Sequence, residues 1–192
     1  MIKAPLHVPE RQIRAYYNDD FIRVYQAYSD EIAEAAIKNG TFTSPPFNLN
    51  RMTWIKPSFL WMMYRSGWGM KDSNQKRILA IDITHEGFRE IVEQGVINQH
   101  VLQDEECRDK IRASDVVIQW DPERDIYLNK LNHRTIQIGL RNAAVENYIN
   151  KWIVSITDIT SLCHDIYLLI EENDISNAEL LMPKESVYYS RS

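Results

Sequence analysis

Residues 51–71 read RMTWIKPSFLWMMYRSGWGMK, and the interpretation of the whole chain depends on this stretch. It holds three of the five tryptophans, Trp54, Trp61 and Trp68. The longer window of residues 51–77 contains six basic residues and one acid, Asp72, so its net charge is +5 in a chain whose total is −5. Aromatic faces beside fixed cations suit a planar, phosphorylated ligand, because rings stack on bases and Arg and Lys hold phosphate oxygens.

The same stretch also predicts local structure. Residues 52–55 favour a short strand, and Pro57 suits the first turn of a helix, where its missing N–H has no intrahelical partner. Residues 58–66 are apolar nearly all round, as in a buried helix, and glycines follow at Gly67 and Gly69. The alternative to a ligand site is therefore a core helix with ordinary basic residues at its edges, since Trp and Met are common core residues.

The length of 192 residues suits a single domain over residues 1–192. An apolar content of 44% is sufficient for a core, and a charged content of 26% is that of a globular protein. Residues 1–11 are expected to form an extended arm, and residues 183–192 a frayed tail. A pI of about 5.6 argues against a general nucleic-acid coat protein, although a local basic patch still allows binding of a nucleotide or a nucleic-acid end.

The cysteines and histidines show no ligand spacing. Cys107 and Cys163 are the only cysteines, so neither a disulfide framework nor a CxxC pair is present. The five histidines are scattered, and we expect no metal site. No stretch has the apolar character of a signal peptide or of a membrane span. We therefore expect a cytoplasmic protein with no membrane partner.

Strand and helix patterns alternate along the chain. Strands are predicted over residues 12–17, 21–28, 52–55, 77–84, 116–120 and 134–140, and helices over residues 30–39, 58–66, 85–94 and 104–113. Asp121 and Pro122 are expected to end the strand over residues 116–120. Neither GxGxxG nor GxxxxGK[ST] occurs, which argues against a doubly wound nucleotide fold. The sequence predicts an α+β domain with a mixed, split β-sheet and a cleft, flanked by helices.

The last third of the chain is predicted to be helical. One apolar stripe recurs at helical spacing through Val145, Tyr148, Ile149, Trp152, Ile153 and Ile156, and a second helix is expected over residues 161–171. The stripe is either core or the contact face of a homodimer.

Three stretches carry a resemblance to a known family. They are IRAYYNDDFIRVYQAYSDEIAEAAI, RMTWIKPSFLWMMYRSGW and RTIQIGLRNAAVENYINKWIVSITDIT. Through them the chain is identified as a member of the domain of unknown function 4291 family, over about residues 12–160. That family implies no activity by itself.

The layout also resembles the opening of the ADP-ribosyltransferase fold. The similar parts are a strand reading VYQA, a helix ending at Gly40, a short strand reading MTWI, a buried helix and a strand reading RILAIDI. In that superfamily two small sheets form a cleft that clamps NAD. The resemblance implies an NAD cofactor and a nucleotide-binding cleft.

The resemblance also implies residue roles. Gln26 lies where the superfamily has a basic catalytic-site residue, with Arg14 or Arg23 as substitutes. The late acid that stabilises positive charge on the ribose corresponds to Asp121 or Glu123. For Asp121 the alternative is a turn residue before proline, and for Arg14 it is an exposed cation on an edge strand.

The remaining site residues follow from the aromatic and basic window. Trp54 or Trp61 could stack on a base, with Tyr64 on the same helix as Trp61. Phosphate oxygens could be held by Arg51, Lys56 and Arg65.

Two functions are compatible with these residues. The first is an NAD-using transferase of ADP-ribosyltransferase type, a glycosyltransferase-type enzyme that acts on a nucleic acid, a protein or a small molecule. The second is a non-catalytic module that binds nucleotides or RNA ends through the same window.

Overall fold

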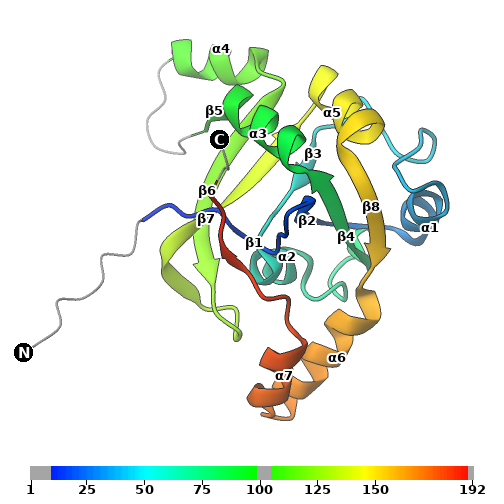
Figure 1. Ribbon diagram of the computed structural model, residues 1–192, viewed down its shortest axis with the longest axis vertical. Coiled ribbons are helices and arrows are strands. Elements are labelled where there is room, and N and C mark those ends of the chain that lie inside the picture. Colours follow the sequence, from blue (N-terminus) through cyan, green and yellow to red (C-terminus); the bar gives the residue numbers. More distant parts are fainter. Residues whose placement is uncertain (1–9, 99–104, 190–192) are drawn as a thin grey trace, which may run out of the picture.

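The fold contains an antiparallel sheet of three strands (Figure 1). The computed structural model describes residues 10–98 and 105–189. The central strand β4 (Arg77–Thr84) lies between β2 (Phe21–Tyr28) and β8 (Ile153–Asp158). Strand β4 is buried from Ile78 to Ile83 because both of its faces are covered.

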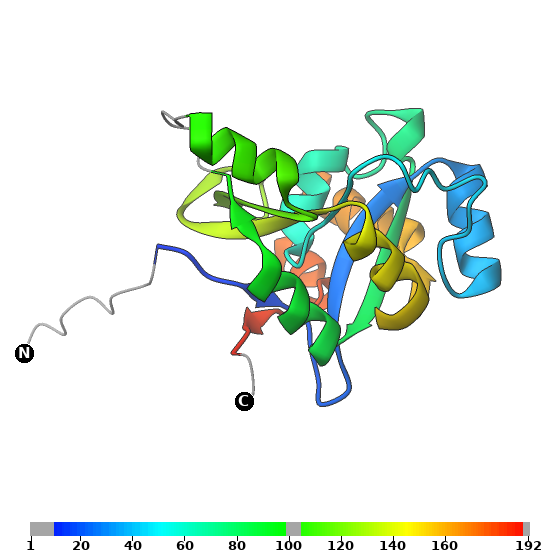
Figure 2. The ribbon, with the colours of Figure 1, turned by 90° about the horizontal axis from the view of Figure 1, so that it is seen from above.

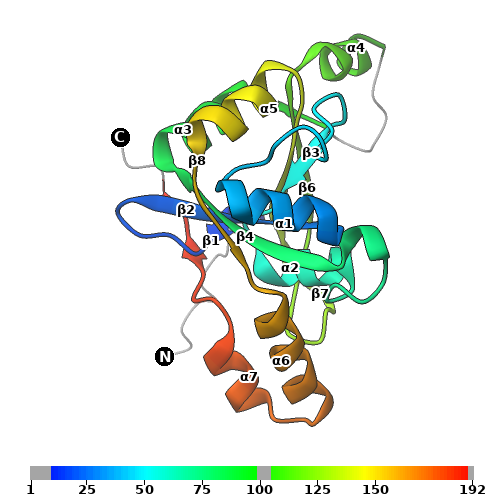
Figure 3. The same ribbon diagram turned by 90° about the vertical axis from the view of Figure 1, so that its right-hand side faces the viewer.

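Helices cover the two faces of this sheet, as seen from the side in Figure 3. Alternate residues of β4 belong to different clusters: Leu79 and Ile81 pack with α1 (Asp30–Asn39), whereas Ile78 and Ala80 pack with α2 (Phe59–Ser66) and α6 (Thr160–Glu171). Because successive side chains of a strand point to opposite faces of the sheet, β4 contributes residues to the core on each face.

The second sheet is mixed. Its order is β3 (Thr53–Ile55), β7 (Lys130–Leu140), β6 (Val116–Arg124) and β5 (Val96–Ile97), with β5 parallel to β6 and the other pairs antiparallel. The predicted mixed, split α+β architecture in a single domain is confirmed.

Strand β6 is longer than predicted. The expected end at Asp121 and Pro122 is wrong, because the strand continues through both to Arg124 with a register shift between Pro122 and Arg124. On the side of β6 that faces away from β7, β5 pairs with it only as far as Ile118. Among the described residues no strand pairs with Pro122 on that side, so its missing N–H removes no hydrogen bond between strands.

The prediction that the last third of the chain is helical is only partly correct. Helix α5 (Ala143–Asn147) and the π-helix Tyr148–Trp152 are followed by strand β8, which completes the first sheet. Val145, Tyr148 and Trp152 of the predicted stripe are buried in the core, and Ile149, Ile153 and Ile156 are partly buried against it, which favours the core alternative over a homodimer face. After β8, α6 is joined by α7 (Ile175–Leu181), and the two helices lie side by side at one end of the molecule (Figures 1 and 3).

Helices α2 and α3 begin at the capping residues in their sequences. The Ser58 hydroxyl accepts a bond from the Trp61 N–H at the start of α2, and Gly67 ends the helix at φ 57°. Thr84 caps α3 (His85–Gln94) in the same way. The remaining helices are α4 (Glu105–Ala113) and the 3₁₀ turn η1 (Ser73–Gln75).

The structure describes the C-terminal segment as far as Tyr189, and part of the expected frayed tail over residues 183–192 is a paired strand. Strand β9 (Ser186–Val187) pairs with β1 (Arg14–Ala15), and the Tyr188 N–H donates to the Ile13 carbonyl at 2.7 Å. Strand β1 is shorter than the predicted strand over residues 12–17. Most of the expected arm, residues 1–9, lies outside the described residues, as do residues 190–192.

Figure 2 shows the molecule from above, with the N-terminal strand beside the C-terminal one. None of the helices in the described ranges is both long enough and apolar enough to traverse a lipid bilayer.

Candidate functional site

A cleft opens where the two sheets diverge. Tyr25 of β2 and Lys56, directly after β3, form an isolated antiparallel bridge, with the Tyr25 N–H donating to the Lys56 carbonyl at 2.8 Å. Beyond this bridge the strands separate and enclose a cavity of about 600 Å³. That volume lies in the range of small-molecule and cofactor sites.

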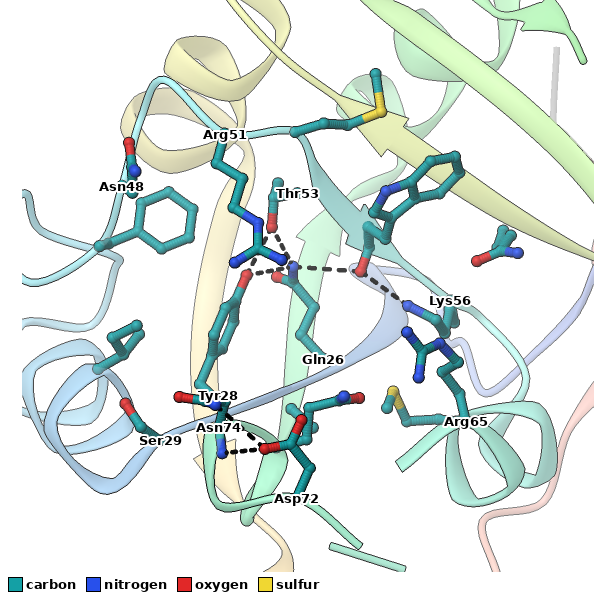
Figure 4. Close-up of a pocket in the computed structure, with 18 of the residues that line it drawn as sticks. Gln26, Tyr28, Ser29, Asn48, Arg51, Thr53, Lys56, Arg65, Asp72 and Asn74 are labelled. Atoms are coloured by element: carbon teal, nitrogen blue, oxygen red, sulfur yellow. Dashed lines mark hydrogen bonds between the residues drawn. The ribbon is translucent and has the colours of Figure 1, made fainter. Parts of the chain in front are cut away.

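The cavity walls come from both sheets and from the segments between them (Figure 4). Three cations, one acid and many neutral polar groups line it: Gln26, Tyr28, Ser29, Asn48, Arg51, Thr53, Lys56, Arg65, Asp72, Asn74, Gln75, Gln119 and Gln137. The apolar lining consists of Ala27, Ile32, Phe47, Met52, Trp54 and Met62.

Arg51, Lys56 and Arg65 converge on the cavity as the sequence predicted. Among the described residues none of the three has a carboxylate within salt-bridge distance. Two other cations of the same basic window are compensated, since Lys76 pairs with Asp30 at 2.8 Å and Arg77 pairs with Asp30 and Asp158. Four cations of the window therefore have no salt bridge among the described residues, and all of them except Lys71 line the cleft.

Lys56 is a buried lysine, 6% exposed, whose Nζ donates to the Trp54 carbonyl at 3.2 Å. Burial and, to a smaller extent, the neighbouring charge of Arg65 lower its pKa from 10.5 to about 7, and Asp121 opposes the shift. Its ammonium is thus close to half-titrated at neutral pH, and an anion in the cleft would favour the charged form.

A hydrogen-bonded network spans the divergence of β2 and β3. Gln26 Nε2 donates to Thr53 Oγ1 at 2.7 Å and lies 2.9 Å from the Tyr28 hydroxyl and 3.3 Å from the Trp54 carbonyl. The Tyr148 hydroxyl donates to Gln26 Oε1 at 2.9 Å. Gln26, proposed from the sequence as catalytic, therefore faces the cleft but is fixed as a structural amide within this network.

Asp72 is the acid of the cavity rim. It caps η1 by accepting the Asn74 N–H at 2.9 Å, and this bond, with the Asn74 amide and the charge of Arg65, holds its pKa below the ordinary value. Asp72 thus supplies a fixed acceptor for hydroxyl or amine donors of a ligand.

The three tryptophans of the opening stretch have different positions. Only Trp54 lines the cavity. Trp61 stacks on Tyr64 with ring centroids 5.1 Å apart, and the Arg124 guanidinium lies 3.6 Å from the Tyr64 centroid, on a different side of α2. Trp68 is core, 5% exposed. Trp61 and Tyr64, expected at the ligand, do not line this cavity, because a helix with apolar residues on every side distributes them to several neighbours.

The two candidate acids lie outside the cavity lining. Asp121 Oδ2 accepts from Gln137 Nε2 at 2.7 Å, and Gln137 also donates to Gln119 Oε1 at 3.0 Å. Asp121 is therefore next to the lining amide of Gln137. Glu123 is buried at 5% exposure, where its Oε1 accepts from Ser58 Oγ and from the Arg124 N–H.

Arg14 is held at the junction of the two chain ends. Its guanidinium lies 3.4 Å from Gln12 Oε1 and 3.3 Å from the Glu185 carbonyl, away from the cavity lining. The structure thus brings together Gln26, Arg51, Trp54, Lys56 and Arg65, and it separates them from Arg14, Trp61, Tyr64 and Glu123.

Sequence reasoning missed several lining groups. Tyr28 shares a strand face with Gln26, and this spacing of two could have identified it. Gln119 and Gln137 meet across β6 and β7 in register, which no local pattern reveals. Within the described ranges no three of His, Cys, Asp or Glu gather as a metal site would require.

Comparison with known proteins gives one family. The family model described as "Domain of unknown function (DUF4291)" matches residues 12–188, which is most of the chain. None of the curated proteins compared with the chain matches it.

Proposed function

Because the chain belongs to the DUF4291 family, a domain family of unknown function, we propose a function from the cleft itself: it binds a nucleotide-type ligand. The phosphate groups lie against Arg51, Lys56 and Arg65, and the planar ring packs against the apolar and aromatic wall that contains Trp54 and Phe47.

The observation that supports this proposal most strongly is the uncompensated charge of the cleft. Arg51, Lys56 and Arg65 have no carboxylate partner among the described residues, whereas Lys76 and Arg77 nearby do. Three cations against the single acid Asp72 leave the cavity lining with an excess of positive charge, which favours an anion there. Arg in particular binds phosphate oxygens with paired N–H groups.

Calorimetric titration with ADP tests the proposal. We expect binding at low ionic strength that weakens as salt is added, because salt screens partly exposed charges. Arg65→Ala should reduce the affinity by about tenfold, which corresponds to a charge-assisted contact. Lys71→Ala is the matched control, because Lys71 is an exposed cation of the same window that does not line the cavity. Binding that is absent at low salt, or equally sensitive to both substitutions, would contradict the proposal.

A second candidate is NAD-dependent transfer of ADP-ribose. The observation that favours it is the hydrogen bond between Asp121 and Gln137, a residue of the cavity wall that the second sheet forms. A carboxylate there would stabilise positive charge that develops on a ribose as nicotinamide leaves.

Incubation with NAD distinguishes the two candidates. A transferase should release nicotinamide and lose that activity in Asp121→Asn, whereas a binding module should bind NAD or ADP without turnover in either protein. Release that persists unchanged in Asp121→Asn would exclude this acid from the reaction.

A further inference from the structure

The three cations of the cleft form two groups. Arg51 acts on the Tyr28 hydroxyl, where its charge lowers the phenol pKa against the stronger effect of burial. Arg65 acts on Lys56 and on Asp72. Figure 4 shows the same division: the Arg51 guanidinium lies by Gln26, Tyr28 and Thr53, and Arg65 lies beside Lys56 on another side.

The group around Arg51 also contains an unused hydroxyl proton. The Trp54 carbonyl accepts and cannot donate, so the end of the Gln26 side chain that faces it is the NH2 group. Its two N–H hydrogens are shared among the Trp54 carbonyl and the Thr53 and Tyr28 hydroxyls, and Nε2 accepts neither hydroxyl proton. The Tyr28 and Thr53 hydroxyls lie 2.6 Å apart and share one hydrogen bond. These two hydroxyls carry two protons, of which their mutual bond uses one.

The second proton has no acceptor in the hydrogen bonds of the described residues. Thr53 is 5% exposed and Gln26 is 2% exposed, and both residues line the cavity together with Tyr28. Burial raises the pKa of Tyr28 to about 12, so its hydroxyl keeps its proton at physiological pH. A hydrogen-bond donor and the Arg51 guanidinium therefore both face the same part of the cavity.

The group around Lys56 is a pair of like charges. Arg65 lowers the pKa of Lys56, which means that the two cations repel each other when both are charged. Asp121, the acid that opposes this effect, is bound to Gln137 and does not line the cavity. An anion between Lys56 and Arg65 would relieve the repulsion, so this pair is a second place for a negative group.

From these two groups we propose that the cleft contains two separate anion subsites, one at Arg51 with the Tyr28 and Thr53 hydroxyls and one between Lys56 and Arg65, and that its ligand is a nucleotide with at least two phosphate groups. This inference rests on the proposed nucleotide binding and names the ligand class. A nucleoside monophosphate occupies one subsite only.

The test compares AMP with ADP and with adenosine 3′,5′-bisphosphate, since the second phosphate occupies a different position in each of the latter two. We expect at least one of them to bind about tenfold or more tightly than AMP. Arg51→Ala should reduce the affinity for the two-phosphate ligand to that of AMP and leave AMP unchanged. Arg65→Ala should weaken AMP and the two-phosphate ligand alike, and Lys71→Ala should change neither.

The hydroxyl donor is tested by the pair Tyr28→Phe and Thr53→Val. Each single variant leaves one hydroxyl proton at the subsite, so we expect the gain in affinity from the second phosphate to fall less than threefold. The double variant leaves none, and the gain should fall by about tenfold. Far-ultraviolet circular dichroism shows whether each variant is folded, and Tyr28→Phe keeps the ring that packs on Phe42 and Phe47.

The outcomes separate the two proposals. If AMP binds but neither second phosphate adds affinity, or if the gain survives Arg51→Ala, the two-subsite inference is overturned and nucleotide binding stands. If no nucleotide binds at low salt, both proposals fail. Side-chain Nε–Hε resonances of Arg51 and Arg65, followed by NMR during titration with inorganic phosphate, give a check without a nucleotide: both should shift, and the Arg51 shift should persist in Arg65→Ala.

Discussion

Lys56 combines two properties that conflict in a lysine: it is buried, and its Nζ has only the Trp54 carbonyl as a hydrogen-bond acceptor among the described residues. Its position follows from the bridge with Tyr25, which fixes the backbone at the point where the sheets separate. A residue placed for the cleft rather than for stability should lower the free energy of unfolding.

The first prediction concerns the loss of stability that results from burying Lys56. The folded-state pKa of Lys56, about 7, lies below the ordinary 10.5, so the penalty is complete below pH 7 and is relieved as pH rises toward 10.5. Lys56→Met should therefore stabilise the protein by about 2–4 kcal/mol at pH 6, with a gain that disappears by about pH 10.5. Urea denaturation at a series of pH values measures it, and a gain independent of pH would contradict the burial of a charge as its cause.

The second prediction concerns protons taken up on binding. A phosphate beside Lys56 favours the ammonium and raises its pKa above 7, so binding of ADP at pH 7.5 should be accompanied by uptake of a fraction of a proton. Affinity should fall as pH rises above 7. Titration calorimetry in two buffers of different ionisation enthalpy measures the uptake. Lys56→Met is the control, and equal uptake in wild type and variant would assign the proton to another group.

At the scale of elements, Glu185 of the C-terminal segment forms a hydrogen bond with the first turn of helix α2. Glu185 Oε1 accepts the Phe59 N–H at 2.6 Å, at the first residue of the helix. Burial raises the Glu185 pKa well above 4.5, nearby Glu123 raises it further, and the Phe59 N–H and Arg14 oppose the shift. The stability that the protonated acid provides is present below pH 4.5 and is lost as pH rises through the folded-state pKa.

The third prediction separates the acceptor from the charge. Glu185→Gln keeps an oxygen for the Phe59 N–H and removes the buried charge, so it should be more stable than wild type at pH 8 and similar at pH 4. Glu185→Ala leaves the N–H without its acceptor and should cost about 1–3 kcal/mol at pH 4. At pH 8 its cost should be smaller, because the substitution also removes the buried charge. Urea midpoints at the two pH values decide the matter. A glutamine variant that is no more stable at pH 8 would show that the carboxylate is charged there at no cost.

Elements with complete local signals could be predicted from the sequence. Strand β2 and strand β4 have the predicted bounds, and helix α3 begins after the Thr84 cap and ends before Gly95 as expected. Strand β8 could not be predicted, because the apolar spacing from Val145 to Trp152 continues into Ile153 and Ile156. Only pairing with the open edge of β4, about 70 residues earlier, makes that segment a strand.

The candidate site was also predictable only where its residues are close together in the sequence. Arg51, Trp54, Lys56 and Arg65 belong to one short stretch, so their composition identified them and the structure brings them to one cavity. The acids depend on long-range register. Asp121 meets Gln137 only because β6 and β7 pair, and Pro122 suggested a turn in what is an extended strand. Residues joined only through tertiary contacts leave no local pattern.

At the scale of the whole molecule, the two chain ends are joined by the last described residues. The Tyr17 hydroxyl donates to the Val187 carbonyl at 3.0 Å, the Tyr188 hydroxyl lies 2.9 Å from His85 Nδ1, and β9 pairs with β1. These contacts connect the N-terminal strand, helix α3 and, through Glu185, helix α2. One wall of the cleft is thereby tied to both ends of the chain.

The fourth prediction follows from this arrangement. Deleting residues 183–192 removes a strand partner, a cap of α2 and a buried aromatic contact, each of which contributes about 1 kcal/mol or more. Because small domains are only marginally stable, the truncated chain should unfold at a much lower urea concentration and bind ADP more weakly, since α2 carries Arg65. Tyr189→Ser is the matched control, because Tyr189 is 74% exposed. A truncated chain with the wild-type midpoint would mean that these contacts do not support the fold. Normal stability with weakened binding would instead show that the segment acts on the position of α2.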